Sequence, residues 1–434
     1  MSKTVKSKFP VVTLRLDKIV GGGQALGTLE SGKKLFAWGG LPSELVSVQI
    51  TKKRSSMAEG RVIEVLEASA DRIEPIDTGS YLSTSPWQIM TPQAESHYKA
   101  ALIEEAFEMH DIVLPNPITV CDNQQRFGYR NKVEFSWFWD KELEKLDLAF
   151  FTRGTRGKIA VDGTSLAHEN INVLARQIRD LLRTKDIEAY SLKTLLIRCD
   201  RDGNCVWQLY TKDDLPDIIS ADEADQLPAR GGEVIYSDPR SPASKITKRL
   251  SSFGELSLKD TILDVAFTYK NEGFFQVNLA MYELALKDIQ LAIETKPIVD
   301  MYSGVGTIGL TLGSSDVTLV ESDDYAVEEM RRNIKSMNSK AKAVHAASEK
   351  ALEYITSDKL IIVDPPRVGL HNDVIDRLLE VKPSRIIYLS CNPVTQARDV
   401  MRLATAYGVK SHSGYNFFPC TPHIEHLVVL DLKP

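Results

Sequence analysis

The residue with the clearest chemical potential is Cys391, which follows a strand-like run at 386–390. Pro393 then opens a predicted helix from 394 to about 406. Ligands bind at the carboxyl ends of strands in an open α/β sheet, and a thiol placed there is a candidate nucleophile. The alternative is that Cys391 is a small buried core residue, the usual fate of a free cysteine. The neighbouring motifs favour the first interpretation.

A second motif has the features of a nucleoside-binding turn. Residues 299–310 read as a strand, a glycine turn and a helix, in which Gly304 and Gly306 let the backbone approach a ligand. The next predicted strand ends in Glu321, 17 residues after Gly304. Its carboxylate can accept hydrogen bonds from both hydroxyls of a ribose. Dinucleotides are also bound by such turns, so this motif alone leaves the cofactor open.

A third motif narrows the choice of cofactor. The predicted strand at 360–364 ends in Asp364, and Pro365 and Pro366 follow. An acidic residue before two rigid prolines in this place is typical of S-adenosylmethionine-dependent methyltransferases that act on a nucleic-acid base. A proline turn after a buried strand is the alternative.

The elements that must position these residues alternate between strand and helix. Such alternation indicates βαβ units and a mostly parallel sheet, and we expect an α/β, Rossmann-like catalytic domain over 269–434. Its predicted strands are 297–302, 317–321, 342–346, 360–364, 385–389 and 426–432, with helices that include 326–336 and 373–380.

The front of the chain has a different pattern. About five short strands with glycine turns between 11 and 68 predict a small barrel of the oligonucleotide-binding type; a barrel used only for assembly is the alternative. The expected domains before the catalytic one are the barrel over 1–70 and a linker, helix and central domain over 71–268. Within the latter we expect a linker at 69–92, a helix at 93–110 and a mixed, mostly β region from 115 that contains a helix at 170–183.

The composition excludes several classes of protein. The 434 residues are 43 % hydrophobic and 26 % charged, which is ordinary for a globular protein of two or three domains. No apolar run approaches the ~20 residues of a membrane span, and the first residues lack the apolar core of a signal peptide, so a cytoplasmic location is expected. Five scattered cysteines without a C-x-x-C pair argue against a disulfide framework or a tetrahedral zinc site.

The charge gives a weak indication of the partner. The net charge of −6 is no nucleic-acid signature, but residues 1–75 carry 12 Lys and Arg against 8 Asp and Glu. A basic front module can meet phosphates, and a solvated face explains the excess equally well.

Taken together, the motifs resemble the RNA uracil-5-methyltransferase family, in particular its barrel-bearing ribosomal and transfer RNA members. The front barrel is similar to the TRAM domain that many members carry, and Arg130-Asn131-Lys132 resembles a family segment of the central domain. The other matching stretches are GFFQVN at 273–278, the turn at 299–310, DPPRVGL at 364–370, SCNP at 390–393 with Thr395 and 397–399, and FPCTPHIE at 418–425.

The resemblance implies covalent catalysis on a uracil base. Carbon 5 of uracil is a poor nucleophile, but addition of a thiolate to carbon 6 gives an enolate whose carbon 5 can take a methyl group. Cys391 matches the family nucleophile, Glu425 matches the base that removes the proton from carbon 5, and Asp364 would hydrogen-bond within the cofactor and uracil pocket. The positions that contact S-adenosylmethionine in the family match Gln276, Tyr302, Thr307 and Glu321.

The sequence departs from the family pattern at two places. Many barrel-bearing relatives hold an iron–sulfur cluster on cysteines just after the barrel and in the central domain, but 75–88 and 162–165 contain none, so no cluster is expected. Relatives usually have an Asp or Asn near position 347 that touches the adenosine. Ala347 cannot replace that contact, so either cofactor affinity is reduced or Ser348 or Glu349 compensates.

The main hypothesis is a monomeric, cytoplasmic RNA methyltransferase that makes 5-methyluridine, with 23S ribosomal RNA as the expected substrate and transfer RNA as the alternative. A catalytically weak RNA-binding or chaperone protein is a competitor, as is a methyltransferase for another base or for DNA. The retention of Cys391 with Glu425 argues against both. For single residues, Glu425 can also be interpreted as a surface carboxylate, and Cys420 is interpreted as structural.

Overall fold

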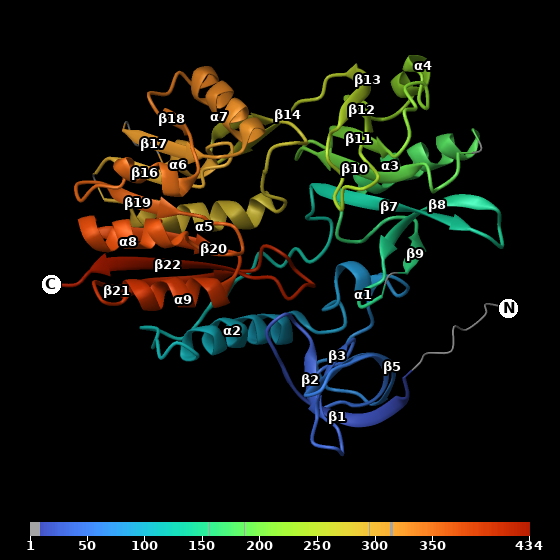
Figure 1. Cartoon of the computed structure of the whole chain (residues 1–434), viewed down its shortest axis with the longest axis horizontal. Coiled ribbons are helices and arrows are strands. Elements are labelled where there is room, and N and C mark those ends of the chain that lie inside the picture. Colours follow the sequence, from blue (N-terminus) through green and yellow to red (C-terminus); the bar gives the residue numbers. More distant parts are fainter. Residues whose placement is uncertain (1–8, 156, 186, 295, 313–315) are drawn as a thin grey trace.

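The computed structural model describes residues 9–155, 157–185, 187–294, 296–312 and 316–434 (Figure 1). These residues form a closed five-stranded barrel, a seven-stranded sheet, a two-stranded sheet and an eight-stranded sheet. None of the helices within them is long and apolar enough to cross a membrane.

The barrel at the front of the chain confirms the predicted fold of this region. Its strands follow the order β1-β2-β3-β5-β4. Alternate residues such as Leu14, Leu16, Val46 and Val48 are buried inside it, as the period of two along a strand requires. The strands are β1 (Val11–Ile19), β2 (Ala25–Thr28), β3 (Lys34–Trp38), β4 (Leu45–Lys53) and β5 (Met57–Glu67).

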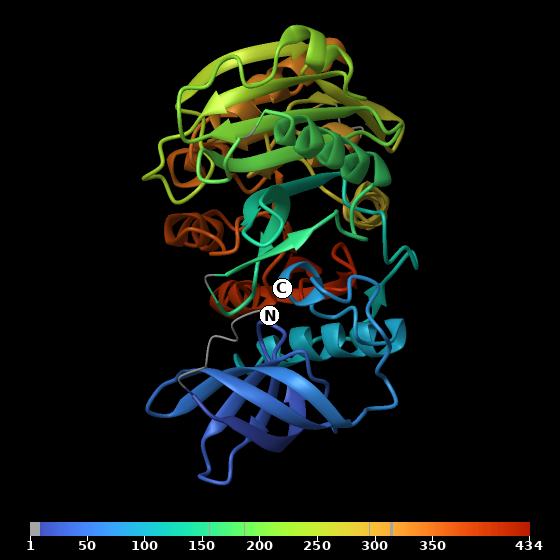
Figure 2. The same cartoon turned by 90° about the vertical axis from the view of Figure 1, so that its right-hand side faces the viewer.

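Two helices connect the barrel with the rest of the molecule. The first, α1 (Tyr81–Thr84), is a single turn, whereas α2 (Pro92–Glu108) is long and begins at the N-cap Thr91. In both views α2 lies between the barrel and the carboxy-terminal sheet (Figure 1 and Figure 2). Its residues Ile103 and Phe107 belong to the apolar core of that sheet.

The central sheet has the order β13-β12-β11-β10-β7-β8-β9, and α3 (Glu169–Arg183) packs on β8 and β10. Its strands are β7 (Lys132–Asp140), β8 (Lys145–Phe151), β9 (Lys158–Val161), β10 (Leu192–Cys199), β11 (Cys205–Thr211), β12 (Gly231–Tyr236) and β13 (Lys248–Gly254), with α4 (Ala221–Asp225) beside them.

One disulfide lies in this central sheet. Cys199 and Cys205 face each other at the end of the β10–β11 pair and are joined by a disulfide. The spacing of the cysteines argued against a disulfide framework and did not indicate this single pair. The pair forms because the antiparallel register of the two strands brings the thiols together.

The carboxy-terminal sheet confirms the predicted α/β fold. Its order is β18-β17-β16-β19-β20-β22-β21-β6, and the first five strands are parallel. β22 runs antiparallel to β20 and to β21. The strands are β16 (Ile298–Met301), β17 (Val317–Glu321), β18 (Lys342–His345), β19 (Leu360–Val363), β20 (Arg385–Ser390), β21 (Tyr407–Tyr415), β22 (Glu425–Leu432) and β6 (Val120–Cys121).

Helices cover both faces of this sheet. Alternate residues of a strand join different cores: on β19, Leu360 and Ile362 belong to one core and Ile361 to the other. One face packs against α5 (Leu279–Ala292), α6 (Thr307–Thr311), α7 (Asp324–Ser336) and the hairpin of β14 (Leu258–Ile262) and β15 (Val265–Tyr269). The other packs against α2, α8 (Asn372–Val381) and α9 (Pro393–Leu403).

Candidate active site

The topology of the carboxy-terminal sheet brings three sequence-predicted residues to one edge. β19 and β20 are parallel neighbours, so the residues that follow them, Asp364 and Cys391, lie at the same end of the sheet. β22 runs the other way and pairs Ser390 with His426, so its first residue, Glu425, lies at that end too. The charges of Glu425 and Asp364 both raise the pKa of the Cys391 thiol, so both carboxyl groups lie near it. This is the edge at which open α/β sheets bind ligands.

Burial sets the protonation of these three side chains. Glu425 is only 4 % exposed, so its interpretation as a surface carboxylate is wrong. Its burial, followed by the charge of Asp364, raises its pKa well above the ordinary value. Burial raises the pKa of Asp364 to about 7. For Cys391, burial and then the two carboxyl groups raise the pKa to about 12, so at neutral pH the thiol keeps its proton.

Two further residues at this edge were not singled out from the sequence. The Arg367 guanidinium (Nη2) lies 3.1 Å from Nδ1 of His423. Burial and the charge of Arg367 lower the pKa of His423 to about 4, so the ring is neutral and accepts this hydrogen bond. Arg367 is also the cation that lowers the pKa of both Cys391 and Glu425. Its place directly after the two prolines was the signal available in the sequence.

Hydrogen bonds hold the loop that carries the thiol. Asn392 caps α9 by accepting from the Val394 backbone N–H at 3.3 Å, and its Nδ2 donates to the Arg367 carbonyl at 2.8 Å. The Thr395 hydroxyl donates to the same carbonyl at 3.2 Å. The loops after β19 and β20 are therefore fixed to each other, which fixes Cys391 relative to Asp364.

The barrel forms one wall of the cavity at Cys391. Gly21 and Gly22, in the turn between β1 and β2, line this cavity of about 180 Å³ together with Cys391, Arg367 and His423. The next residue, Gly23, has φ +89°, and a Cβ there would lie 2.2 Å from Cβ of Pro422. Only glycine fits this close approach.

Trp87 strengthens the same contact. Its indole N–H donates to the Gly23 carbonyl at 3.0 Å, and its backbone N–H donates to the Cys420 carbonyl at 3.0 Å. One residue of the linker therefore joins the barrel turn to the loop that leads into Glu425. Nothing in the sequence indicated this three-way contact.

The glycine turn after β16 has open space where a cofactor is expected. Gly304, at φ +57°, would meet only the Phe274 carbonyl, at 3.9 Å, if it carried a Cβ. Glu321, at the end of β17, accepts from the Gly304 backbone N–H at 2.9 Å. Gly306 is tightly packed against leucine side chains, so it serves the turn itself. Open backbone beside a fixed carboxylate fits the nucleoside part of S-adenosylmethionine.

The remaining predicted cofactor residues differ in how they lie. Tyr302, at φ +65°, accepts at its hydroxyl from Ser348 Oγ at 2.7 Å, which places Ser348 beside the turn. Thr307 is buried and its hydroxyl is 2.8 Å from the hydroxyl of Tyr282. Gln276 is buried as well, and its carbonyl accepts from Asn131 Nδ2 at 2.9 Å.

Tyr282 is another residue that sequence reasoning missed. Burial, and then the charge of Asp364, raises its pKa far above the ordinary value, and Glu425 acts in the same direction. A neutral hydroxyl therefore lies near both carboxyl groups. Tyr282 belongs to α5, a helix whose apolar residues carry no sign of a polar role.

The burial of Cys420 supports its interpretation as a structural residue. Its side chain is fully buried, and its backbone N–H donates to Glu95 Oε1 at 2.8 Å. Within the described ranges, no group of three or more His, Cys, Asp or Glu side chains is arranged to hold a metal ion.

Comparison with known proteins agrees with the chemistry of this edge. Residues 340–433 match the family model of tRNA (uracil-5-)-methyltransferases. An uncharacterized RNA methyltransferase of Halalkalibacterium halodurans is 27 % identical over 98 % of both chains, and one of Nitratidesulfovibrio vulgaris is 25 % identical over 96 % of this chain and 95 % of its own.

A solved structure shares the whole fold. The tRNA (uracil-54, C5)-methyltransferase of Pyrococcus abyssi, in complex with S-adenosyl-L-homocysteine, superposes with a TM-score of 0.77 at 21 % identity. The match covers 96 % of this chain and 100 % of that one. The fold and the site thus define an S-adenosylmethionine-dependent RNA methyltransferase. Within that class, the chain is similar to the RNA uracil-5-methyltransferases, through the family model over residues 340–433 and through the shared fold.

Proposed function

We propose that this enzyme methylates carbon 5 of a uridine in RNA through a covalent adduct between Cys391 and carbon 6 of the base. The observation that carries the proposal is the convergence of Cys391, Asp364 and Glu425 at one edge of the sheet. There the two carboxyl groups are near enough to raise the pKa of the thiol. A methyltransferase acting on an exocyclic amine has no need of a thiol. A uracil-5 enzyme needs a nucleophile for carbon 6 and a base for carbon 5.

The proposed reaction balances with the groups present. The thiol first passes its proton to water in the cavity, and the sulfur then forms a bond to carbon 6 while the carbon 5–carbon 6 π electrons become an enolate. Carbon 5 gains a methyl group; S-adenosylmethionine, when bound, supplies it as an electrophile. Glu425 then removes the proton on carbon 5, the double bond re-forms, and the carbon 6–sulfur bond breaks to release the thiolate.

Each neighbouring group has a task in this scheme. Arg367 is the cation that favours the thiolate and the ionised Glu425, since it lowers the pKa of both. Asp364 hydrogen-bonds to the base. Gly304, Glu321 and Tyr302 would hold the nucleoside part of S-adenosylmethionine.

The RNA substrate has two candidates. The hypothesis drawn from the sequence has 23S ribosomal RNA as the expected substrate. The matching family model and the Pyrococcus abyssi enzyme both carry the name of a transfer RNA uracil-5 methyltransferase, which favours transfer RNA. In either RNA the target uridine must leave its stack to reach Cys391. Mapping 5-methyluridine by mass spectrometry in both RNAs, from cells with and without the gene, decides between them.

Trapping with 5-fluorouridine tests the covalent step. Fluorine at carbon 5 cannot be removed as a proton, so wild-type enzyme with S-adenosylmethionine and 5-fluorouridine RNA should form a stable protein–RNA adduct. Cys391→Ala should form none. Cys121→Ala, which removes another half-buried thiol outside the site, should react like wild type. Equal adduct formation by Cys391→Ala and wild type would disprove the mechanism.

A further inference from the structure

A cavity of about 390 Å³ lies away from Cys391, where the linker, the central sheet and the segment before α5 meet. This volume is in the range of small-ligand sites, about 300–1,000 Å³. We call it the Arg130 cavity. Its walls include Arg130, Val133, Phe150, Thr84, Thr164 and Val277.

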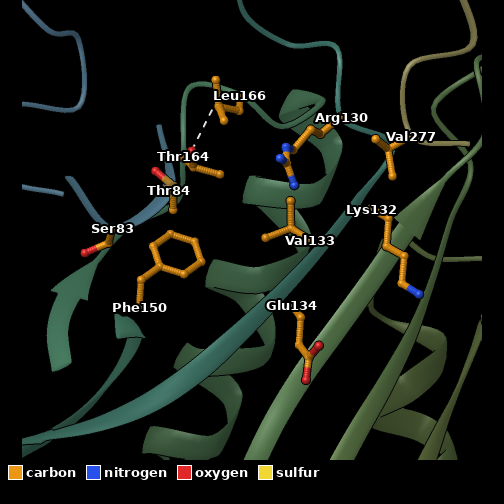
Figure 3. Close-up of a pocket in the computed structure, with 10 residues that line it drawn as sticks. All are labelled: Ser83, Thr84, Arg130, Lys132, Val133, Glu134, Phe150, Thr164, Leu166 and Val277. Atoms are coloured by element: carbon orange, nitrogen blue, oxygen red, sulfur yellow. Dashed lines mark hydrogen bonds between the residues drawn. The ribbon is translucent and has the colours of Figure 1, made fainter. Parts of the chain in front are cut away.

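The lining combines apolar and hydroxyl-bearing side chains with three charged residues, Arg130, Lys132 and Glu134. In Figure 3 the Arg130 guanidinium points toward Val133, with Phe150, Thr84 and Thr164 across from it. The side chains of Lys132 and Glu134 point away from this group. A flat apolar wall with hydroxyls and one guanidinium suits a nucleotide, because the base can pack on the ring while the phosphate meets the cation.

Arg130 is held in place by its backbone, and among the residues that the structure describes no carboxylate contacts its guanidinium. Its N–H donates to the Leu166 carbonyl at 2.9 Å and its carbonyl accepts from the His168 N–H at 2.9 Å. The guanidinium instead lies against aromatic rings, 5.9 Å from the ring centre of Tyr129 and 5.8 Å from that of Phe418. A fixed guanidinium of this kind is available to bind a phosphate.

A line of cations and rings connects the Arg130 cavity with the thiol. Phe418, beside Arg130, lies 6.0 Å from the ring of His423, and His423 contacts Arg367 in the cavity of Cys391. Phe418 and His423 are half-buried, so part of each side chain is accessible. Aromatic side chains interleaved with cations are the pattern that binds single-stranded nucleic acid.

We propose that the Arg130 cavity binds a second unstacked nucleotide of the RNA strand, with its phosphate on Arg130, while the target uridine occupies the cavity at Cys391. This inference rests on the proposed function, because it assumes that RNA enters at Cys391. It assigns to the linker and the central sheet a direct part in holding the substrate strand open. Holding a neighbouring nucleotide unstacked helps the target base to leave the stack.

Two variants test the cavity from different sides. Arg130→Gln removes the cation, and Thr84→Trp fills the space from α1. The probe is an in vitro transcript whose 5-fluorouridine form is trapped by the wild-type enzyme. Binding of this transcript is measured by fluorescence anisotropy over a range of salt concentrations. Arg240→Gln, which removes an exposed arginine of the central domain, is the matched control for loss of charge.

Arg130→Gln should weaken RNA binding about tenfold, as expected for the loss of a charge-assisted hydrogen bond. It should also make the dependence of log affinity on log salt shallower by about 0.7, the value for one phosphate contact in a single strand. Thr84→Trp should weaken binding without changing that slope, and Arg240→Gln should change neither. Sparse 4-thiouridine in the transcript should cross-link to peptides containing Val133 or Phe150 in the wild type.

Three results would overturn the inference. The first is wild-type affinity for RNA in both Arg130→Gln and Thr84→Trp, and the second is an unchanged salt dependence of RNA binding in Arg130→Gln. The third is binding of free nucleotides to the cavity while neither variant changes the affinity for RNA. Circular dichroism verifies that Thr84→Trp is folded. If Thr84→Trp does not fold, the inference is tested by Arg130→Gln alone. Trapping of 5-fluorouridine RNA at saturating RNA should persist in all variants. Its loss in the wild type would instead refute the proposed function.

Discussion

The surroundings of the Cys391 thiol favour its protonated form. Burial and two carboxyl groups raise its pKa to about 12, and Arg367 only partly opposes them. A neutral thiol is a poor nucleophile, but it also resists oxidation, which proceeds through the thiolate. The resting enzyme therefore protects the residue that it needs in the reaction. The sequence predicted the place of this thiol; it could not predict the protonation, which depends on residues that come together only in the fold.

The rate of adduct formation should rise with pH. Because the folded pKa of Cys391 is raised, the thiolate fraction grows about tenfold per pH unit from about pH 6 to about pH 9. The raised pKa of Glu425 acts in the same direction, since this carboxyl group must also lose its proton to serve as a base. Single-turnover trapping of 5-fluorouridine RNA measures the first of these effects. A rate that falls with pH anywhere in this range would contradict the assignment.

Glu425→Gln should stop the reaction after the methyl group has been added. Glutamine has the shape of the protonated acid that the buried site favours, so the fold should be unchanged, but it cannot remove the proton from carbon 5. Turnover should fall by about 10²–10⁴, and a methylated protein–RNA adduct should accumulate on ordinary uridine RNA. Denaturing gel shift and mass spectrometry detect it. The exposed Glu353→Gln is the control, and normal turnover by Glu425→Gln would assign the proton transfer elsewhere.

At the scale of elements, α2 supports the loop that leads into Glu425. Glu95 and Lys99 on this helix are both buried, and their charged groups are 3.0 Å apart. Lys99 donates to the Phe418 carbonyl at 3.1 Å, and Glu95 accepts from the Cys420 backbone N–H at 2.8 Å. The pair thus fixes both ends of the segment 418–420, in the loop that enters β22.

Breaking this pair should therefore destabilise the protein and impair catalysis together. Lys99→Met leaves Glu95 buried with a weaker partner, which costs about 3–5 kcal/mol when a buried ion pair loses one member. Replacing both, as in Glu95→Gln with Lys99→Met, should recover much of the loss. Urea unfolding measures the stability, and kcat at saturating RNA measures the positioning of Glu425. Wild-type stability in Lys99→Met would show that the pair is dispensable.

Local patterns explain which elements were predictable. The strands β16, β17, β19 and β20 are mostly apolar, β-branched runs between turn residues, and each was expected within a residue or two of its observed bounds. β21 was missed, because most of its side chains are polar or half-exposed. Nothing in a polar strand of this kind distinguishes it from a loop; its pairing with β22 defines it.

At the scale of the whole molecule, the sequence predicted the kinds of fold but not their contacts. The barrel and the α/β sheet follow from patterns within each region. Two contacts between distant segments were beyond reach: β6, at Val120–Cys121, joins the edge of the carboxy-terminal sheet, and Gly23 packs on Pro422. Such contacts depend on how folded domains pack against each other, which local sequence patterns do not specify. The domain boundaries at 70 and 268 accordingly remain predictions.

The barrel turn at Gly21–Gly23 has a consequence for how such a protein can change over evolution. Because this turn is a wall of the cavity at Cys391, loss or exchange of the barrel in this chain would remove one side of that cavity and not only a surface that adds affinity for RNA. A replacement barrel would have to present a glycine-rich turn of the same shape to Pro422. In proteins that have this contact, the barrel and the catalytic sheet are therefore expected to be inherited as a unit, with substrate preference diversifying on the barrel's outer face and the turn at Cys391 kept constant.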